Sequence, residues 1–62
     1  MKTKLESALE KIDLGMYTDG ANELRALEAD LPALDPVIEK LDFGDNDGAA
    51  ELLRQVIANQ PG

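Results

Sequence analysis

The residues of this chain best suited to chemistry lie in one acidic loop, residues 42–48, which reads Asp-Phe-Gly-Asp-Asn-Asp-Gly. A calcium-binding loop of the helix-loop-helix type has oxygen ligands at its first, third and fifth positions, Gly at the sixth and a bidentate Glu at the twelfth. If Gly48 is the sixth residue, the first is Phe43 and the twelfth is Arg54. Because two ligands are missing and a positive charge is added, we expect helix capping and turn formation here, and no metal site.

Nucleophilic and acid-base catalysis are both disfavoured by composition. The chain has no His and no Cys, its one Ser is Ser7, and its only Thr residues are Thr3 and Thr18. Glu6 and Glu10 lie one helical turn apart on a face that we expect to be solvated, not in a cleft. We therefore predict a protein that is not an enzyme, with no catalytic residues and no cofactor.

An internal repeat organises the whole chain. Residues 9–15, Leu-Glu-Lys-Ile-Asp-Leu-Gly, return as residues 38–44, Ile-Glu-Lys-Leu-Asp-Phe-Gly, at an offset of 29 positions (9 to 38). The same offset aligns Ala21 with Ala50, Leu24 with Leu53, Arg25 with Arg54 and Pro32 with Pro61. A two-helix unit of about thirty residues cannot bury its apolar stripe alone, so the two units must pack on each other or on a partner.

The first unit reads as two helices joined at Gly15. Apolar side chains recur at spacings of three and four in both helices, at Leu5, Ala8, Leu9 and Ile12 and then at Ala21, Leu24, Leu27 and Leu31. Gly15 can take the left-handed conformation that ends a helix, and Thr18 or Asp19 can cap the next one. Pro32 should end the second helix at or before Leu31.

The second unit repeats this plan with a shorter first helix. Asp35-Pro36 is a helix start signal, with Asp as the cap and Pro at the first helical position, and Gly44 repeats the role of Gly15. The oxygens of residues 45–47 can cap the last helix. This helix carries two adjacent apolar stripes and should be the most central, with the set Ala49, Ala50, Leu52, Leu53, Val56 and Ile57. We expect Gly20 and Gly48, like Gly15 and Gly44, to lie at helix ends.

These elements predict an all-α fold, a compact four-helix arrangement of two repeated antiparallel helical hairpins. Hairpin one spans about residues 3–31 and hairpin two about residues 35–60, within a single domain covering residues 1–62. Short connections favour antiparallel neighbours, and a pseudo-twofold axis is the natural packing of two equivalent hairpins. Several crossing angles satisfy the same stripes, so the tilt between the hairpins stays open.

The charge balance bears on the kind of partner. Thirteen acidic and six basic residues give a net charge of −7, and the basic residues are scattered. Nucleic-acid binding and attraction to anionic membranes are disfavoured, whereas a protein partner with a basic surface would be attracted. The acidity can also serve simply to keep a small domain in solution. With no long apolar run and no recognisable signal peptide, we expect a cytoplasmic protein.

The second helix of each unit resembles part of a known repeat family. Residues 44–62, with their Gly, Ala, Leu pair and closing Pro, look like the second helix of a tetratricopeptide repeat, and residues 15–32 are similar. The period of this chain is 29 residues where that family has about 34, and its short first helices lack the family's bulky aromatic signature.

The chain also resembles the C-terminal helical segment of bacterial hybrid sensor kinases of two-component systems. The matching features are the turn Leu41-Asp42-Phe43 and the Ala-x-x-Leu-Leu helix at residues 49–53. This resemblance implies an accessory interaction role near a phosphorelay, and without His the segment could not itself accept a phosphoryl group on that residue type.

We therefore expect a small, acidic, non-enzymatic protein-protein interaction module that binds another protein or associates with itself. The alternative is a regulatory accessory segment of a bacterial two-component signalling protein, without phosphotransfer activity of its own. Candidate contact residues are Tyr17, Leu52 and Val56, although all three could instead belong to a closed core.

Overall fold

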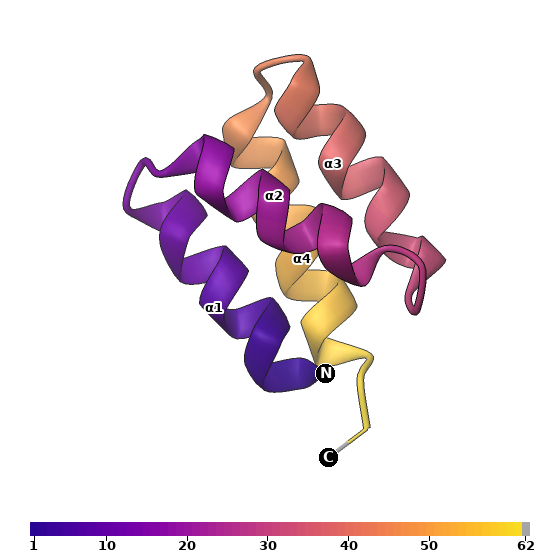
Figure 1. Ribbon diagram of the computed structural model, residues 1–62. Helices are drawn as coiled ribbons and strands as arrows, with labels where there is room; N and C mark the ends of the chain where they lie inside the picture. Colours follow the sequence, from indigo (N-terminus) through magenta and orange to yellow (C-terminus); the bar gives the residue numbers. More distant parts are fainter. Residues whose placement is uncertain (62) are drawn as a thin grey trace.

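The computed structural model describes residues 1–61, which form four α-helices and one short 3-10 turn (Figure 1). The elements in chain order are α1 (Lys2–Asp13), α2 (Tyr17–Leu27), the 3-10 turn (Pro32–Leu34), α3 (Asp35–Asp42) and α4 (Asn46–Ala58). Helix α1 packs on α2 and α3 packs on α4, so the chain consists of two consecutive helical hairpins. The all-α, four-helix prediction is confirmed.

The four helices form a ring of neighbours. Within each hairpin the two helices are in contact, and between the hairpins α1 contacts α4 while α2 contacts α3. Figure 1 shows α2 in front and α4 behind, with α1 and α3 on either side. This arrangement places the apolar stripe of every helix toward a common interior.

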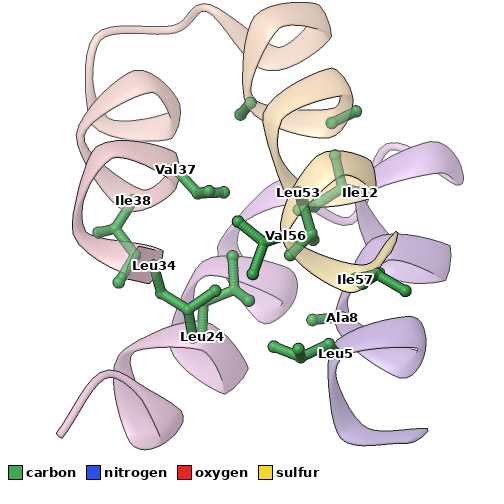
Figure 2. Close-up of a cluster of buried hydrophobic side chains, with 12 residues drawn as sticks. Leu5, Ala8, Ile12, Leu24, Leu34, Val37, Ile38, Leu53, Val56 and Ile57 are labelled. Atoms are coloured by element: carbon green, nitrogen blue, oxygen red, sulfur yellow. The ribbon is translucent and has the colours of Figure 1, made fainter. Parts of the chain in front are cut away.

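The core is aliphatic, and α4 contributes most to it. Leu5, Leu24, Leu34, Val37 and Leu53 are the largest fully buried side chains. Figure 2 shows side chains from all four helices meeting in one core. In this view Leu53 and Val56 of α4 lie between Val37 of α3 and Ile12 of α1. Five residues of α4 are buried, more than in any other helix, which agrees with the wide apolar face expected for it, although α4 has two neighbouring helices like every other helix of the ring.

The sequence repeat appears in three dimensions as a pseudo-twofold relation between the hairpins. Two equivalent pairs of large core residues have equal burial, because Leu5 and Leu34 are both fully buried, as are Leu24 and Leu53. The contact of α1 with α4 is the counterpart of the contact of α3 with α2. The two hairpins therefore meet through equivalent surfaces, as the two subunits of a symmetric dimer do.

Two ion pairs between the hairpins obey the same symmetry. Arg25 of hairpin one lies 2.6 Å from an oxygen of Asp42 in hairpin two. Arg54, the equivalent of Arg25, lies 2.9 Å from Asp13, the equivalent of Asp42. All four side chains are exposed, so each pair contributes only about 0.2–1 kcal/mol to stability.

Two predicted helix caps are wrong. Helix α2 begins at Tyr17, before Thr18 and Asp19, and Met16 occupies its N-cap without a side-chain hydrogen bond. Asp35 is the first residue of α3 and not its cap, because the preceding 3-10 turn runs directly into the helix. The prediction for α4 is confirmed, since the Asp45 carboxylate accepts a hydrogen bond from the Gly48 amide at 3.1 Å.

Gly20 lies in the first turn of α2, near a helix end as expected, but it is buried, and close packing explains it where turn chemistry was expected. A methyl group at this position would lie 2.7 Å from Cγ1 of Ile12 and 3.2 Å from the carbonyl oxygen of Ala8. Glycine is needed here so that α2 can lie close to α1. Gly15 and Gly44, in contrast, have φ values of 85° and 84° and end their helices as predicted.

Candidate functional site

The two hairpin turns are built identically. In the first, the Gly15 amide donates to the Ile12 carbonyl and the Met16 amide to the Lys11 carbonyl. In the second, the amides of Gly44 and Asp45 make the equivalent two bonds to Leu41 and Lys40. Both are Schellman motifs, in which a left-handed glycine allows two amides to satisfy the last carbonyls of the helix. The glycine fixes where the residues on either side of it point.

At these turns the chain exposes four large apolar side chains. Leu14 and Phe43, which are equivalent in the repeat, precede the two glycines and are 68% and 81% exposed. Met16 and Tyr17 follow the first glycine and are 43% and 42% exposed. We call these four residues, Leu14, Met16, Tyr17 and Phe43, the turn surface.

A shallow depression of about 140 Å³ lies between the start of α2 and the end of α3. Its floor and walls come from both hairpins, and its lining consists of Tyr17, Thr18, Ala21, Arg25, Leu41 and Asp42. The Arg25–Asp42 ion pair forms its polar part, while Tyr17 and the half-buried Leu41 supply apolar surface. The depression could hold one apolar side chain of a partner next to a charged or hydrogen-bonding group.

Most basic side chains of the molecule are already paired internally. In addition to Arg25 and Arg54, Lys11 lies 2.6 Å from Glu23 and Lys40 lies 3.4 Å from Asp45. These four are all the basic residues beyond Lys4 in the sequence. Within residues 1–61, nine carboxylates have no such partner: Glu6, Glu10, Asp19, Glu28, Asp30, Asp35, Glu39, Asp47 and Glu51. Beyond the first turn of α1, the unpaired charge on the surface is therefore negative.

A small polar cluster joins α1 to α2 within hairpin one. The Ser7 hydroxyl donates to Glu23 at 3.1 Å, and Lys11 is close to both groups. The hydrogen bond with Glu23 raises the pKa of Lys11, and the same bond lowers the pKa of Glu23. These shifts favour the charged forms of both residues, which indicates a structural ion pair and not a proton donor or acceptor for catalysis.

The three candidate contact residues from the sequence lie in different environments. Tyr17 is exposed and lines the depression. Leu52 is partly buried and packs against the core, and Val56 is a core residue with 9% of its surface exposed. Tyr17 is exposed at the first hairpin turn together with Leu14 and Met16, whereas Val56 belongs to the closed core that the sequence left open as an alternative.

Sequence reasoning did not identify Leu14, Met16 and Phe43 as candidates. A signal for two of them was present, because Leu14 and Phe43 fall outside the apolar stripes of their helices and occupy equivalent repeat positions directly before a turn glycine. An apolar residue off the stripe is expected to face solvent. Met16 lies within a turn, where periodicity gives no indication of burial.

Within residues 1–61, no group of three or more His, Cys, Asp or Glu side chains is placed so that it could hold a metal ion. None of the helices in this part of the chain is both long enough and apolar enough to cross a membrane.

Comparison with known proteins gives no further assignment: no protein-family model matches the chain, and neither the curated proteins nor the solved structures contain a match.

Proposed function

We propose that this protein is a non-enzymatic protein-protein interaction module and that the turn surface is its contact site. The observation that carries the proposal is the exposure of Leu14, Met16, Tyr17 and Phe43 at the two hairpin turns, while the apolar residues of the helix stripes are buried or packed against the core. Large apolar side chains that stay exposed beside a depression are typical of protein contact sites.

Met16 provides a second argument, because stability alone would favour another residue at its position. Its repeat equivalent is Asp45, which caps α4 through a hydrogen bond to Gly48. The two backbones are nearly the same, with φ and ψ of −88° and 62° at Met16 and −83° and 70° at Asp45. Met is a poor N-cap residue, and it is a side chain that adapts well to binding surfaces. A contact role for Met16 explains why this position lacks the cap.

The charges around the turns indicate the chemistry of the partner. Asp19 and Asp47 lie in the first turns of α2 and α4, next to the hairpin turns, and neither has an ion-pair partner within residues 1–61. A partner that combines an apolar side chain with flanking Lys or Arg would meet both the turn surface and these carboxylates. The proposed partner is thus a basic segment of another protein that carries an exposed apolar residue.

The first test is selection from a displayed library of random peptides. We expect the peptides that bind the wild-type protein to carry Lys or Arg around an apolar residue and to bind more weakly as salt rises, since exposed charges are screened. Phe43→Ser and Tyr17→Ser should each weaken binding, by about tenfold or more if either is a central contact. Phe43→Ser should change the free energy of unfolding by no more than about 0.5 kcal/mol, because the side chain is exposed.

Ala33→Ser is the matched control. Ala33 is exposed in the 3-10 turn that connects the hairpins, at the far end of α2 from the turn surface (Figure 1). This variant should bind the selected peptides like the wild type. Peptides that bind the Phe43→Ser, Tyr17→Ser and Ala33→Ser proteins equally well would show that the turn surface is not the contact site.

A further inference from the structure

The interface between the two hairpins is self-complementary. Helix α1 faces α4 while its equivalent α3 faces α2, and the two ion pairs Arg25–Asp42 and Arg54–Asp13 occupy equivalent places. Both hairpins contribute equivalent contacts to the interface between them. A second copy of the chain therefore carries a surface that fits either hairpin of the first copy.

The connection between the hairpins changes direction at a single extended residue. After α2 the backbone continues as a hydrogen-bonded turn, in which the Leu31 amide donates to the Leu27 and Glu28 carbonyls. Leu31 itself is extended, with φ −143° and ψ 83°, and the 3-10 turn then begins at Pro32. The proline excludes the helical conformation for Leu31 but leaves it a broad extended range. A change of the Leu31 torsions can therefore separate the hairpins while the helices on both sides stay intact.

We propose that two copies of this protein exchange hairpins, so that hairpin one of each copy packs on hairpin two of the other. The partner is a second copy of the chain, and the contact surface is the same α1–α4 and α2–α3 interface that holds the monomer together. The core contacts within each hairpin stay within one copy, the contacts between hairpins and both ion pairs re-form between copies, and the backbone differs mainly at Leu31. The free energy of the exchanged dimer then differs from that of two monomers mainly through the loss of translational freedom. The fraction of chains in the dimer therefore rises with protein concentration.

This exchange has a consequence for binding. An exchanged dimer carries two turn surfaces on one particle, and a partner with two basic segments could engage both and gain affinity through avidity. That consequence rests on the proposed function, whereas the exchange itself does not.

Charge reversal at the ion pairs tests the exchange directly. One variant carries Asp13→Arg and Asp42→Arg, so that both positions in its own monomer pair Arg with Arg. The other carries Arg25→Asp and Arg54→Asp, which pairs Asp with Asp. Each monomer then contains two repulsive contacts, while an exchanged heterodimer of the two variants contains four attractive ones.

The measurement is the solution mass after the two variants are unfolded together and refolded at equal concentration. We expect a species with one copy of each variant, exceeding either homodimer by about tenfold or more, since each homodimer contains four repulsive contacts where the heterodimer contains four attractive ones. Wild-type protein refolded at rising concentration should likewise show an increasing dimer fraction. Two variants that keep their separate masses after refolding together would overturn the proposal.

Two controls exclude simple attraction between the variants. Each Asp→Arg change adds two charges and each Arg→Asp change removes two, so the net charges move from −7 to −3 and −11, and both proteins stay acidic. A variant with Glu10→Arg and Glu39→Arg has the same charge of −3, but it changes two exposed, equivalent positions outside the ion pairs. It should form no preferred heterodimer with the Arg25→Asp and Arg54→Asp protein; an equal preference would contradict hairpin exchange.

Discussion

At the scale of single residues, the two hairpins differ most clearly in how closely their helices approach. Gly20 is buried against Ile12 and the Ala8 carbonyl, whereas its repeat equivalent, Ala49, carries a methyl group in the core of hairpin two. A repeat position can thus be held by Gly in one unit and Ala in the other. The difference reflects the space left by the facing helix and not the backbone conformation, since both residues are helical.

Gly20→Ala should destabilise the protein although Ala is the better helix former. The added methyl would lie 2.7 Å from Ile12 Cγ1, and we expect a net cost of about 1–3 kcal/mol in the free energy of unfolding. Chemical denaturation measures it. In an Ile12→Ala background the cost of Gly20→Ala should fall, because the crowded side chain is gone. A stabilising effect of Gly20→Ala in the wild-type background would show that α1 and α2 can move apart without loss.

At the scale of elements, the hairpin turn is the unit that the sequence repeats most faithfully. Both turns have the same glycine conformation, the same two amide-carbonyl bonds and nearly the same backbone at the following N-cap. They differ in the N-cap side chain, Met16 in one and Asp45 in the other. Local structure is therefore conserved between the units while the N-cap side chain differs, which is what we expect if Met16 has a binding role.

This similarity makes two substitutions reciprocal. Asp45→Ala should destabilise the protein by about 0.5–2 kcal/mol through loss of the cap, and Met16→Asp should stabilise it by a smaller or similar amount through a new cap on the Asp19 amide. Thermal or chemical unfolding measures both. If Met16 is a contact residue, Met16→Asp should at the same time weaken binding of the selected peptides. A gain in stability with unchanged binding would remove Met16 from the proposed contact site.

At the scale of the whole molecule, the connection between the hairpins gives stability a dependence on pH. Glu28 follows α2 and Asp35 begins α3, and a hydrogen bond between these two carboxyl groups raises the pKa of Glu28 above its ordinary value of 4.5. The folded chain thus binds this proton more tightly than the unfolded chain does. The resulting stabilisation is complete below pH 4.5 and is lost as the pH rises through the folded pKa.

Glu28→Gln should remove this dependence. The amide can still donate to Asp35 and carries no charge, so the variant should be more stable than the wild type at neutral pH, with the advantage shrinking as the pH falls toward 4.5. Urea denaturation across this range measures the difference. Glu23→Gln is the control with the opposite pH dependence, because Lys11 lowers the pKa of Glu23. This substitution should reduce the free energy of unfolding at neutral pH. It should change that free energy little once the pH is below the pKa of Glu23 in the folded chain. Parallel pH profiles for Glu28→Gln and the wild type would contradict the assigned pair.

The fold was largely predictable because its determinants are local or repeated. Apolar spacing in each segment defined four helices, Gly15 and Gly44 marked the turns, and the offset between the units implied the pseudo-twofold packing. The errors at Thr18, Asp19 and Asp35 arose because capping oxygens are common near turns, and the residue that becomes the cap depends on the geometry of the preceding turn.

The sequence by itself determined the helical class, the hairpin pairing and the acidic charge, since periodicity and composition act within each segment. Only the tertiary structure decided that Met16 and Tyr17 are exposed, that Val56 is buried, and that Arg25 and Arg54 pair across the hairpins. Burial depends on whether another helix covers a side chain, and the Arg54–Asp13 pair joins residues far apart in the chain. Such contacts exist only after the two hairpins have packed together.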